Sequence, residues 1–71
     1  MLQQIPRDDI EFLRGTTVYR KVYYEFGALV THDRVSILGW SKSGKTVQVL
    51  DPVEDRKFFV RQENLFENVE P

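Results

Sequence analysis

One segment of this sequence has residue types and spacing that could bind phosphate. Residues 39–46, Gly39-Trp-Ser-Lys-Ser-Gly-Lys-Thr46, match the phosphate-loop pattern G-x-x-x-x-G-K-[ST] at every fixed position. Such a loop must lead into a helix, whose first N–H groups bind the phosphates. Residues 46–50 instead alternate β-branched residues and end at Asp51-Pro52, which is typical of a strand. We therefore interpret the match as a β-hairpin loop with Gly44 at positive φ, and expect no nucleotide binding.

Catalytic chemistry has little support in this sequence. His32 is the single histidine and falls beside Asp33 in a predicted turn, with no local signature that would bring a serine to it. The chain contains no cysteine, so a zinc site would lack its usual ligands. We expect no enzyme activity, catalytic residue, metal or cofactor. Three pairs of carboxylates could in principle act as acid and base, but each suits a structural position instead. Asp8/Asp9 suit a helix start, Glu54/Asp55 a turn and Glu63/Glu67 a polar surface.

Aromatic residues interleaved with cations give the stronger functional signal. Bases of single-stranded nucleic acid stack on such rings while cations bind the backbone, and protein interfaces are anchored by the same residue types. A third interpretation is structural, because Tyr and Trp often cover the edge of a small core. The residues predicted to bind a partner are Tyr19, Lys21 and Tyr23 on one strand face, and Trp40, Lys42 and Lys45 around the hairpin loop.

Size and composition limit what the chain can be. Seventy-one residues predict one domain with a marginal core, without disulfides and with little room for a catalytic cavity. No apolar run approaches the length of a membrane span, and residues 1–9 lack a secretory signal. We therefore expect a cytoplasmic protein without a membrane partner. Residues 1–13, 14–45 and 46–71 carry net charges of −2, +4 and −3. This layout indicates either a polarised surface suited to steering a partner or ordinary solvated faces.

Periodicity and turn residues predict the following elements. Residues 1–15 contain a short helix at 6–14, residues 16–66 form a barrel, and residues 67–71 are a tail. Strands are expected at 16–26, 34–40, 46–50 and 57–61, with a turn at His32-Asp33 and a helical turn at 62–66. On the first strand one face carries Val18, Val22, Tyr24 and Phe26. The residues predicted to be buried are Val22, Val35, Ile37, Val47, Val49, Val60 and Leu65. The apolar stripe expected to dock the helix on the sheet is formed by Ile10, Leu13 and Phe12.

Four or five short strands with tight turns predict a mostly β fold, a small, strongly bent antiparallel barrel. Residues 47–66, with Val47-x-Val49-x-Asp51, a short loop, Val60 and then Leu65, resemble the third and fourth strands and closing turn of SH3-like barrels, Tudor modules in particular. Tudor modules have an Asp-Tyr-Gly turn where this chain has Asp51-Pro52-Val53. That departure argues against a methyl-lysine-reading aromatic cage, and no site residue is carried over.

A second resemblance is to small RNA-binding regulators of the carbon-storage type. It rests on Leu38-Gly39, Val47, Pro52 and the closing Arg61-Gln62-Glu63. Together these observations predict a non-enzymatic binding module, an accessory or regulatory adaptor that binds a larger intracellular protein. The alternative is a small barrel that binds single-stranded RNA or DNA with the same residues, although the sequence pI of about 5.7 is low for a dedicated nucleic-acid binder.

Overall fold

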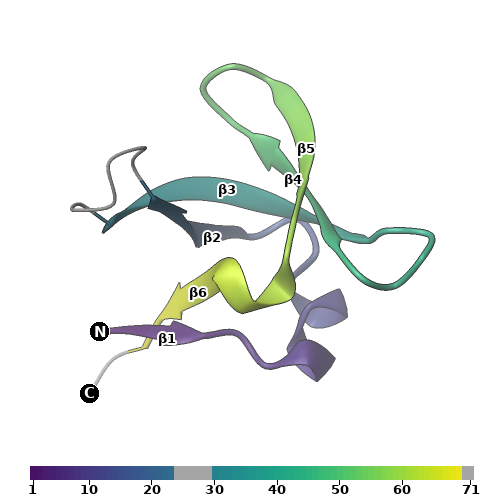
Figure 1. The fold of residues 1–71 in the computed structure, drawn as a ribbon, viewed down its shortest axis with the longest axis horizontal. Coiled ribbons are helices and arrows are strands. Elements are labelled where there is room, and N and C mark those ends of the chain that lie inside the picture. The colour runs from purple at the N-terminus through teal and green to yellow at the C-terminus, as the bar shows by residue number, and fades with distance from the viewer. Residues whose placement is uncertain (24–29, 70–71) are drawn as a thin grey trace.

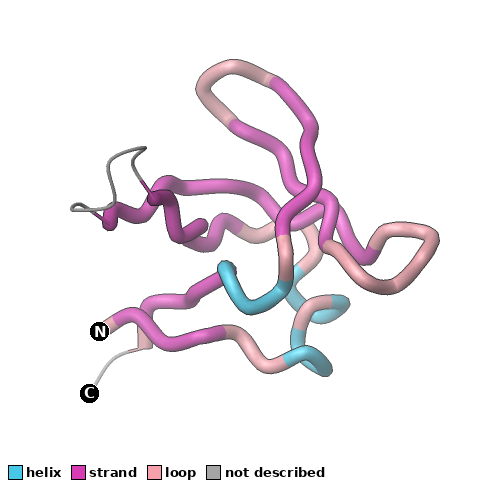
Figure 2. Tube along the Cα trace, viewed as in Figure 1, coloured by secondary structure: helices cyan, strands magenta, loops and turns pink. Residues whose placement is uncertain are grey.

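The computed structural model describes residues 1–23 and 30–69, which are mostly β (Figures 1 and 2). In this part of the chain six antiparallel strands form one sheet. Their bounds are β1 Leu2–Gln4, β2 Thr17–Tyr23, β3 Val30–Trp40, β4 Val47–Asp51, β5 Arg56–Val60 and β6 Leu65–Asn68. The mostly β prediction is confirmed, with more strands than the four or five expected.

The order of the strands in the sheet is β1-β6-β2-β3-β4-β5. Strands β2, β3 and β4 each pair with the next strand along the chain, and β6 then returns to pair with β2. Strand β1 pairs with the other edge of β6, so these two strands lie side by side (Figure 1). No ladder joins β1 to β5 among the described residues, so the sheet is open there.

The predicted N-terminal helix is present as two separate 3₁₀ turns. These are η1, Arg7–Asp9, and η2, Glu11–Leu13. Ile10 lies between them with a helical backbone conformation and is fully buried. The segment therefore keeps turning through Ile10, with the i→i+3 hydrogen bonds of a 3₁₀ helix, Ile10 N to Arg7 O and Leu13 N to Ile10 O. Gly15 follows with a φ of 81°, a left-handed conformation that ends the helical segment.

The closing part of the chain contains a strand that the sequence did not predict. The expected helical turn is η3, Gln62–Asn64, and Leu65 after it is fully buried, as predicted. The prediction of a tail from residue 67 is wrong, because β6 runs to Asn68. This strand is short, and the partners that satisfy its backbone come from β1 and β2, far away in the sequence.

The predicted turn at His32-Asp33 is also wrong. Both residues lie within β3, an eleven-residue strand that pairs with β2 along most of its length. Arg20 lies opposite Asp33 and its Nη2 is 3.2 Å from the Asp33 Oδ2, an ion pair that favours the extended conformation. The predicted positions Tyr24 and Phe26 lie outside the described residues.

The core consists of aliphatic side chains, and no polar side chain is buried among the described residues. Five of the seven predicted strand and turn positions are fully buried, and Val60 packs against them. Val22 is only half-buried, because it lies beyond Arg20, past the last core residue of β2. The burial of Ile5 was not predicted. The buried residues are Ile5, Ile10, Val18, Val35, Ile37, Val47, Val49 and Leu65.

A register shift in β3 changes the face of its last residues. Ile37 lies opposite Val49, but after the shift Gly39 lies opposite Gln48 and Trp40 opposite Val47. Val47 is fully buried, so Trp40 projects toward the core and packs against it. Without the shift, Trp40 would have projected to the outer face of the sheet.

Truncation of a core residue should unfold much of this small domain. Ile37→Ala removes a fully buried side chain and should lower the free energy of unfolding by about 2–5 kcal/mol. Val53→Ala is the control, because Val53 is 90% exposed. Urea denaturation followed by circular dichroism measures both. Equal stability of the two variants would contradict the assigned strand faces.

Gly44 adopts a φ of 71°, as the hairpin interpretation predicted. A Cβ added there meets nothing within 4 Å, so the cost of substitution comes from the backbone alone. Gly44→Val should therefore destabilise the chain by at least about 1 kcal/mol. Gly44→Asn should cost less, because Asn tolerates the left-handed region. Thermal melts that rank the two variants in the opposite order would count against this turn geometry.

Candidate functional site

The segment that matches the phosphate-loop pattern is a β-hairpin loop, as predicted, and β4 follows it. Four of its N–H groups donate to acceptors within the loop. Ser41 N donates to Thr46 O at 2.8 Å and Gly44 N to Ser41 O at 3.0 Å. Lys45 N donates to Ser43 Oγ, and Thr46 N to Ser41 Oγ, each at 3.3 Å. These groups are therefore not directed at a shared phosphate position, as a phosphate loop requires.

The six residues predicted to bind a partner lie in two separate places. Tyr23 is opposite Val30, the first residue of β3, whereas Trp40 is the last residue of that strand. The two rings also lie on opposite faces of the sheet, because the register shift turns Trp40 toward the core. The structure therefore divides the predicted site into a group on β2, formed by Tyr19, Lys21 and Tyr23, and a group at the hairpin, formed by Trp40, Lys42 and Lys45.

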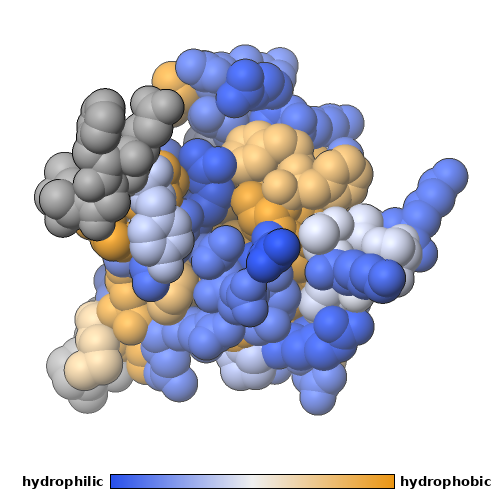
Figure 3. All heavy atoms as spheres, in the orientation of Figure 1, coloured by the Kyte–Doolittle hydropathy of each residue, from blue (hydrophilic) through white to orange (hydrophobic). Residues whose placement is uncertain are grey.

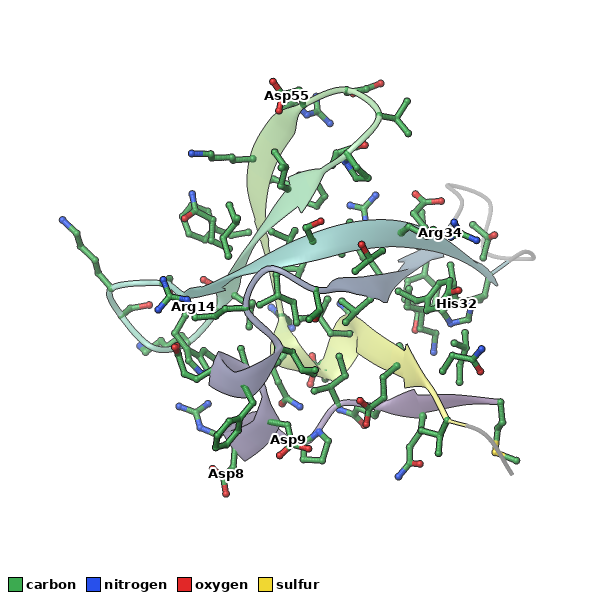
Figure 4. All side chains as sticks on the ribbon, turned by 180° about the vertical axis from the view of Figure 1, so that it is seen from behind. Asp8, Asp9, Arg14, His32, Arg34 and Asp55 are labelled. Carbon is green, nitrogen blue, oxygen red and sulfur yellow. The ribbon has the colours of Figure 1, made fainter. Side chains whose placement is uncertain are left out.

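The β2 group belongs to a larger surface on the outer face of the sheet. Val18 and Val35 are paired, buried and inward, so their neighbours along each strand face outward. Tyr19 lies between Arg34 and Phe66 in register. Figure 4 shows His32 and Arg34 near the same end of β3. We call this surface the outer-face patch: Tyr19, Lys21, Tyr23, His32, Arg34 and Phe66.

Aromatic rings and cations are in direct contact within the outer-face patch. His32 and Phe66 meet edge to face, with ring centroids 5.3 Å apart. The Lys21 Nζ lies 5.1 Å from the Tyr23 ring centroid. Tyr23 is 60% exposed, whereas Tyr19, His32 and Phe66 are half-buried. The patch therefore presents one prominent ring beside an ordered aromatic surface.

The hairpin group lies beside an open pocket of about 400 Å³. Arg7 of η1, Lys45 of the loop and Arg61 before η3 reach it from three segments that are distant in the sequence. In Figure 1 the η1 turn and the loop lie on the same side of the molecule. We call this site the hairpin pocket, and its lining residues are Arg7, Lys45, Thr46, Arg61, Gln62 and Glu63.

Trp40 is covered by a cation from the N-terminal segment. The Arg7 Cζ lies 4.4 Å from the centroid of the indole ring, and Arg7 Nη2 donates to Gly44 O at 3.1 Å. The ring also packs against the core. Trp40 therefore lies at the edge of the core and holds the Arg7 guanidinium over its ring. It does not line the pocket. Lys42 projects from the same loop without lining the pocket.

A third surface feature is the apolar edge of the sheet. Figure 3 shows apolar atoms gathered over β4 and β5. Phe59 is 58% exposed, while Phe58 is half-buried with the Arg20 Cζ 4.6 Å from its ring centroid. Arg56 and Lys57 are exposed on the same strand, and charges of this kind keep an edge strand from pairing with other chains.

No catalytic arrangement is visible in the described residues. His32 packs on Phe66, and the close pair Ser41 Oγ and Ser43 Oγ, 3.0 Å apart, belongs to the hairpin loop. Residues 1–23 and 30–69 contain no cluster of three or more His, Cys, Asp or Glu residues that could hold a metal. In the same ranges no helix has the length and apolar character needed to cross a bilayer.

Sequence reasoning missed several residues of these surfaces. His32 would have been placed with Arg34 and Ser36 on the outer face, had the strand predicted from Arg34 been extended back to Val30 through its β-branched residues. Phe66 required the pairing of β6 with β2. Arg7 and Arg61 had no local signal, because only the fold brings them to the hairpin.

The hairpin interpretation leads to a test with nucleotide. The chain should show no saturable micromolar binding of Mg–ATP or Mg–GTP, because the loop N–H groups bind within the loop. Lys45→Ala should leave the fold intact, since Lys45 is exposed. Calorimetric titration of the wild type, with Lys42→Ala as the matched loop control, measures this. Micromolar binding that Lys45→Ala alone abolishes would contradict the interpretation.

The surfaces described above are defined by this chain's own geometry. Comparison with known proteins finds no family model that matches the chain, and no similar curated protein or solved structure. A function can therefore be inferred only from the residues of the outer-face patch and the hairpin pocket.

Proposed function

We propose that this chain is a non-enzymatic binding module, an accessory or regulatory protein that docks onto a larger intracellular protein. The outer-face patch is the docking surface. The observation that carries this proposal is the environment of Tyr23, a 60% exposed ring at the edge of a half-buried aromatic surface. Such rings bury a large area at low entropic cost, and they anchor protein interfaces. Lys21 and Arg34 form a polar rim.

The fold that we propose for the module is an SH3-like barrel. Its support is the order β6-β2-β3-β4-β5, a meander followed by the 3₁₀ turn Gln62–Asn64 and a return to the first meander strand. The residues that resemble SH3-like barrels occupy β4, the end of β5 and the start of β6. Strong bending of a sheet in this order brings its inner side chains together around one small core.

Protein is favoured over nucleic acid because aromatic rings in the described residues already contact the chain's own cations. Lys21 lies near Tyr23, Arg7 over Trp40 and Arg20 over Phe58. A nucleic-acid base stacking on the same face would have to displace the cation. The net charge of −1 also provides little general attraction for a phosphate backbone.

The proposal predicts that Tyr23 is the residue on which partner binding depends most. Tyr23→Ala should weaken binding of the captured partner by about 2 kcal/mol or more, close to thirtyfold in Kd, chiefly through faster dissociation. The immobilised chain first captures the partner from an extract of its source organism, and biolayer interferometry then measures the variants. Trp40→Ala is unsuitable for this purpose, because Trp40 packs against the core.

Phe59→Ala is the matched control for this experiment. Phe59 is 58% exposed, close to the 60% of Tyr23, and it lies on β5 outside the outer-face patch. Its truncation should leave partner binding unchanged. Equal losses in the two variants, or a loss confined to Phe59→Ala, would move the interface away from the patch and contradict the proposal.

Binding of single-stranded nucleic acid is the second candidate, supported by Lys21 beside the Tyr23 ring and by the exposed Lys42 and Lys45 of the hairpin loop. It predicts affinity that falls steeply with ionic strength, with a log–log slope of about −0.7 per phosphate contacted. Neutralising Lys21, Lys42 or Lys45 should then make this slope less steep by nearly the amount that one phosphate contact contributes. We expect no such binding at moderate salt. Sub-micromolar binding of RNA or DNA that weakens in these variants would reverse the order of the two candidates.

A further inference from the structure

The hairpin pocket has a chemistry of its own. Arg7, Lys45 and Arg61 line it, and Glu63 is the single carboxylate among its lining residues. A cationic site on a chain of net charge −1 is a local feature that can select an anionic group. We propose that the hairpin pocket binds the carboxylates of an acidic peptide segment. This inference rests on the proposed function, because the segment belongs to the protein partner.

Arg7 is ordered before any ligand arrives. Its guanidinium lies 4.4 Å from the Trp40 ring centroid, and its Nη2 donates to Gly44 O at 3.1 Å. Gly44 O is its one hydrogen-bond acceptor among the described residues, and a guanidinium carries five N–H donors. A carboxylate in the pocket can therefore accept from an arginine that loses little side-chain entropy on binding.

Lys45 and Arg61 supply the other two charges. Both side chains are exposed, and Arg61 Nη1 is 3.7 Å from the Glu63 Oε1. An exposed pair of this kind contributes little stability, so an incoming carboxylate can share Arg61 at small cost. Gln62 Nε2 donates to Ile5 O and fixes this wall of the pocket to the N-terminal segment.

Two observations favour carboxylates of a peptide over nucleic acid. Arg7 covers one face of Trp40, the ring beside the pocket, which disfavours base stacking there. A volume of about 400 Å³ is suited to one or two acidic side chains. Asp8 and Asp9 neighbour Arg7 in sequence, but neither lines the pocket, and Figure 4 shows both at the η1 turn below the hairpin.

The test is a titration of the chain with a short amidated oligoglutamate peptide carrying a fluorescent label, followed by anisotropy at low ionic strength. The oligoglutamine peptide controls for charge. Lys45→Ala and Arg61→Ala remove pocket cations. Their matched controls are Lys42→Ala, in the same loop, and Arg56→Ala, whose exposed pair with Glu54 at 3.9 Å resembles that of Arg61 with Glu63.

Each pocket variant should weaken oligoglutamate binding by about threefold to tenfold, whereas each control changes it by less than about twofold. Added salt should weaken binding in the wild type, because the site is exposed. In two-dimensional NMR spectra the amide resonances of Gly44, Thr46 and Gln62 should shift on titration, and those of the outer-face patch should not. Oligoglutamine should cause neither effect.

Equal losses in pocket and control variants would overturn the inference, since they would indicate non-specific charge attraction. Resonance shifts confined to the outer-face patch would overturn it as well. Oligouridine that binds more tightly than oligoglutamate, and is lost in the pocket variants, would assign the site to nucleic acid. If a partner binds in a Tyr23-dependent way and oligoglutamate does not bind, the proposed function stands and only this inference is wrong.

If oligoglutamate binds in the pocket and no partner depends on Tyr23, the docking proposed for the outer-face patch is wrong instead.

Discussion

The hairpin pocket depends on the register shift in β3 between Ile37 and Gly39, and the outer-face patch lies on the part of the strand before that shift. Before the shift, the strand contributes Val35 and Ile37 to the core and sends His32 and Arg34 outward. After it, Trp40 faces inward, opposite Val47. A bulge of this kind bends a strand and re-aims its side chains. The Trp40 ring then stacks against the Arg7 guanidinium, which also donates a hydrogen bond to Gly44 O in the hairpin loop. Arg7 thereby forms one side of the hairpin pocket.

The N-terminal segment links this end of the molecule to the rest of the core. Ile5 and Ile10 are fully buried beside Leu65, and Arg14 Nε donates to Leu38 O at 3.1 Å. The Arg14 side chain also covers Gly39, where a Cβ would meet its Nε at 3.4 Å. A domain this small has few buried side chains, so the segment that completes the core also sets the position of Arg7.

The fold was largely predictable from local patterns, and its exceptions have physical causes. Alternation of β-branched residues located β4, and the turn at residues 51–55 located the start of β5. The Gly44 turn followed from the need for a positive φ. The β1 and β6 strands were missed, because short strands at the chain ends are stabilised by partners far away in the sequence. The turn assigned to His32 was wrong for a related reason, since pairing with β2 overrides the local preference of Asp33 for a turn.

The candidate site was predictable only in part. Strict alternation placed Tyr19, Lys21 and Tyr23 together on one face of β2, and that face exists. Trp40 was expected beside the hairpin loop, but its inward direction was not, because a single-residue register shift leaves no clear sign in the sequence and reverses every side chain after it. The convergence of Arg7, Lys45 and Arg61 is tertiary and could not be read from spacing.

The partner that we propose for this chain is a protein rather than a nucleic acid. Affinity purification of the tagged chain from its own organism, with one half of the lysate treated with nuclease, distinguishes these two kinds of partner. We expect a stoichiometric protein partner of equal abundance in both halves. That partner should be retained as salt rises to moderate levels, because an aromatic-anchored interface depends on salt mainly through its on-rate. Nucleic acid in the untreated half, with the loss of every associated protein after nuclease, would show that the partner is nucleic acid.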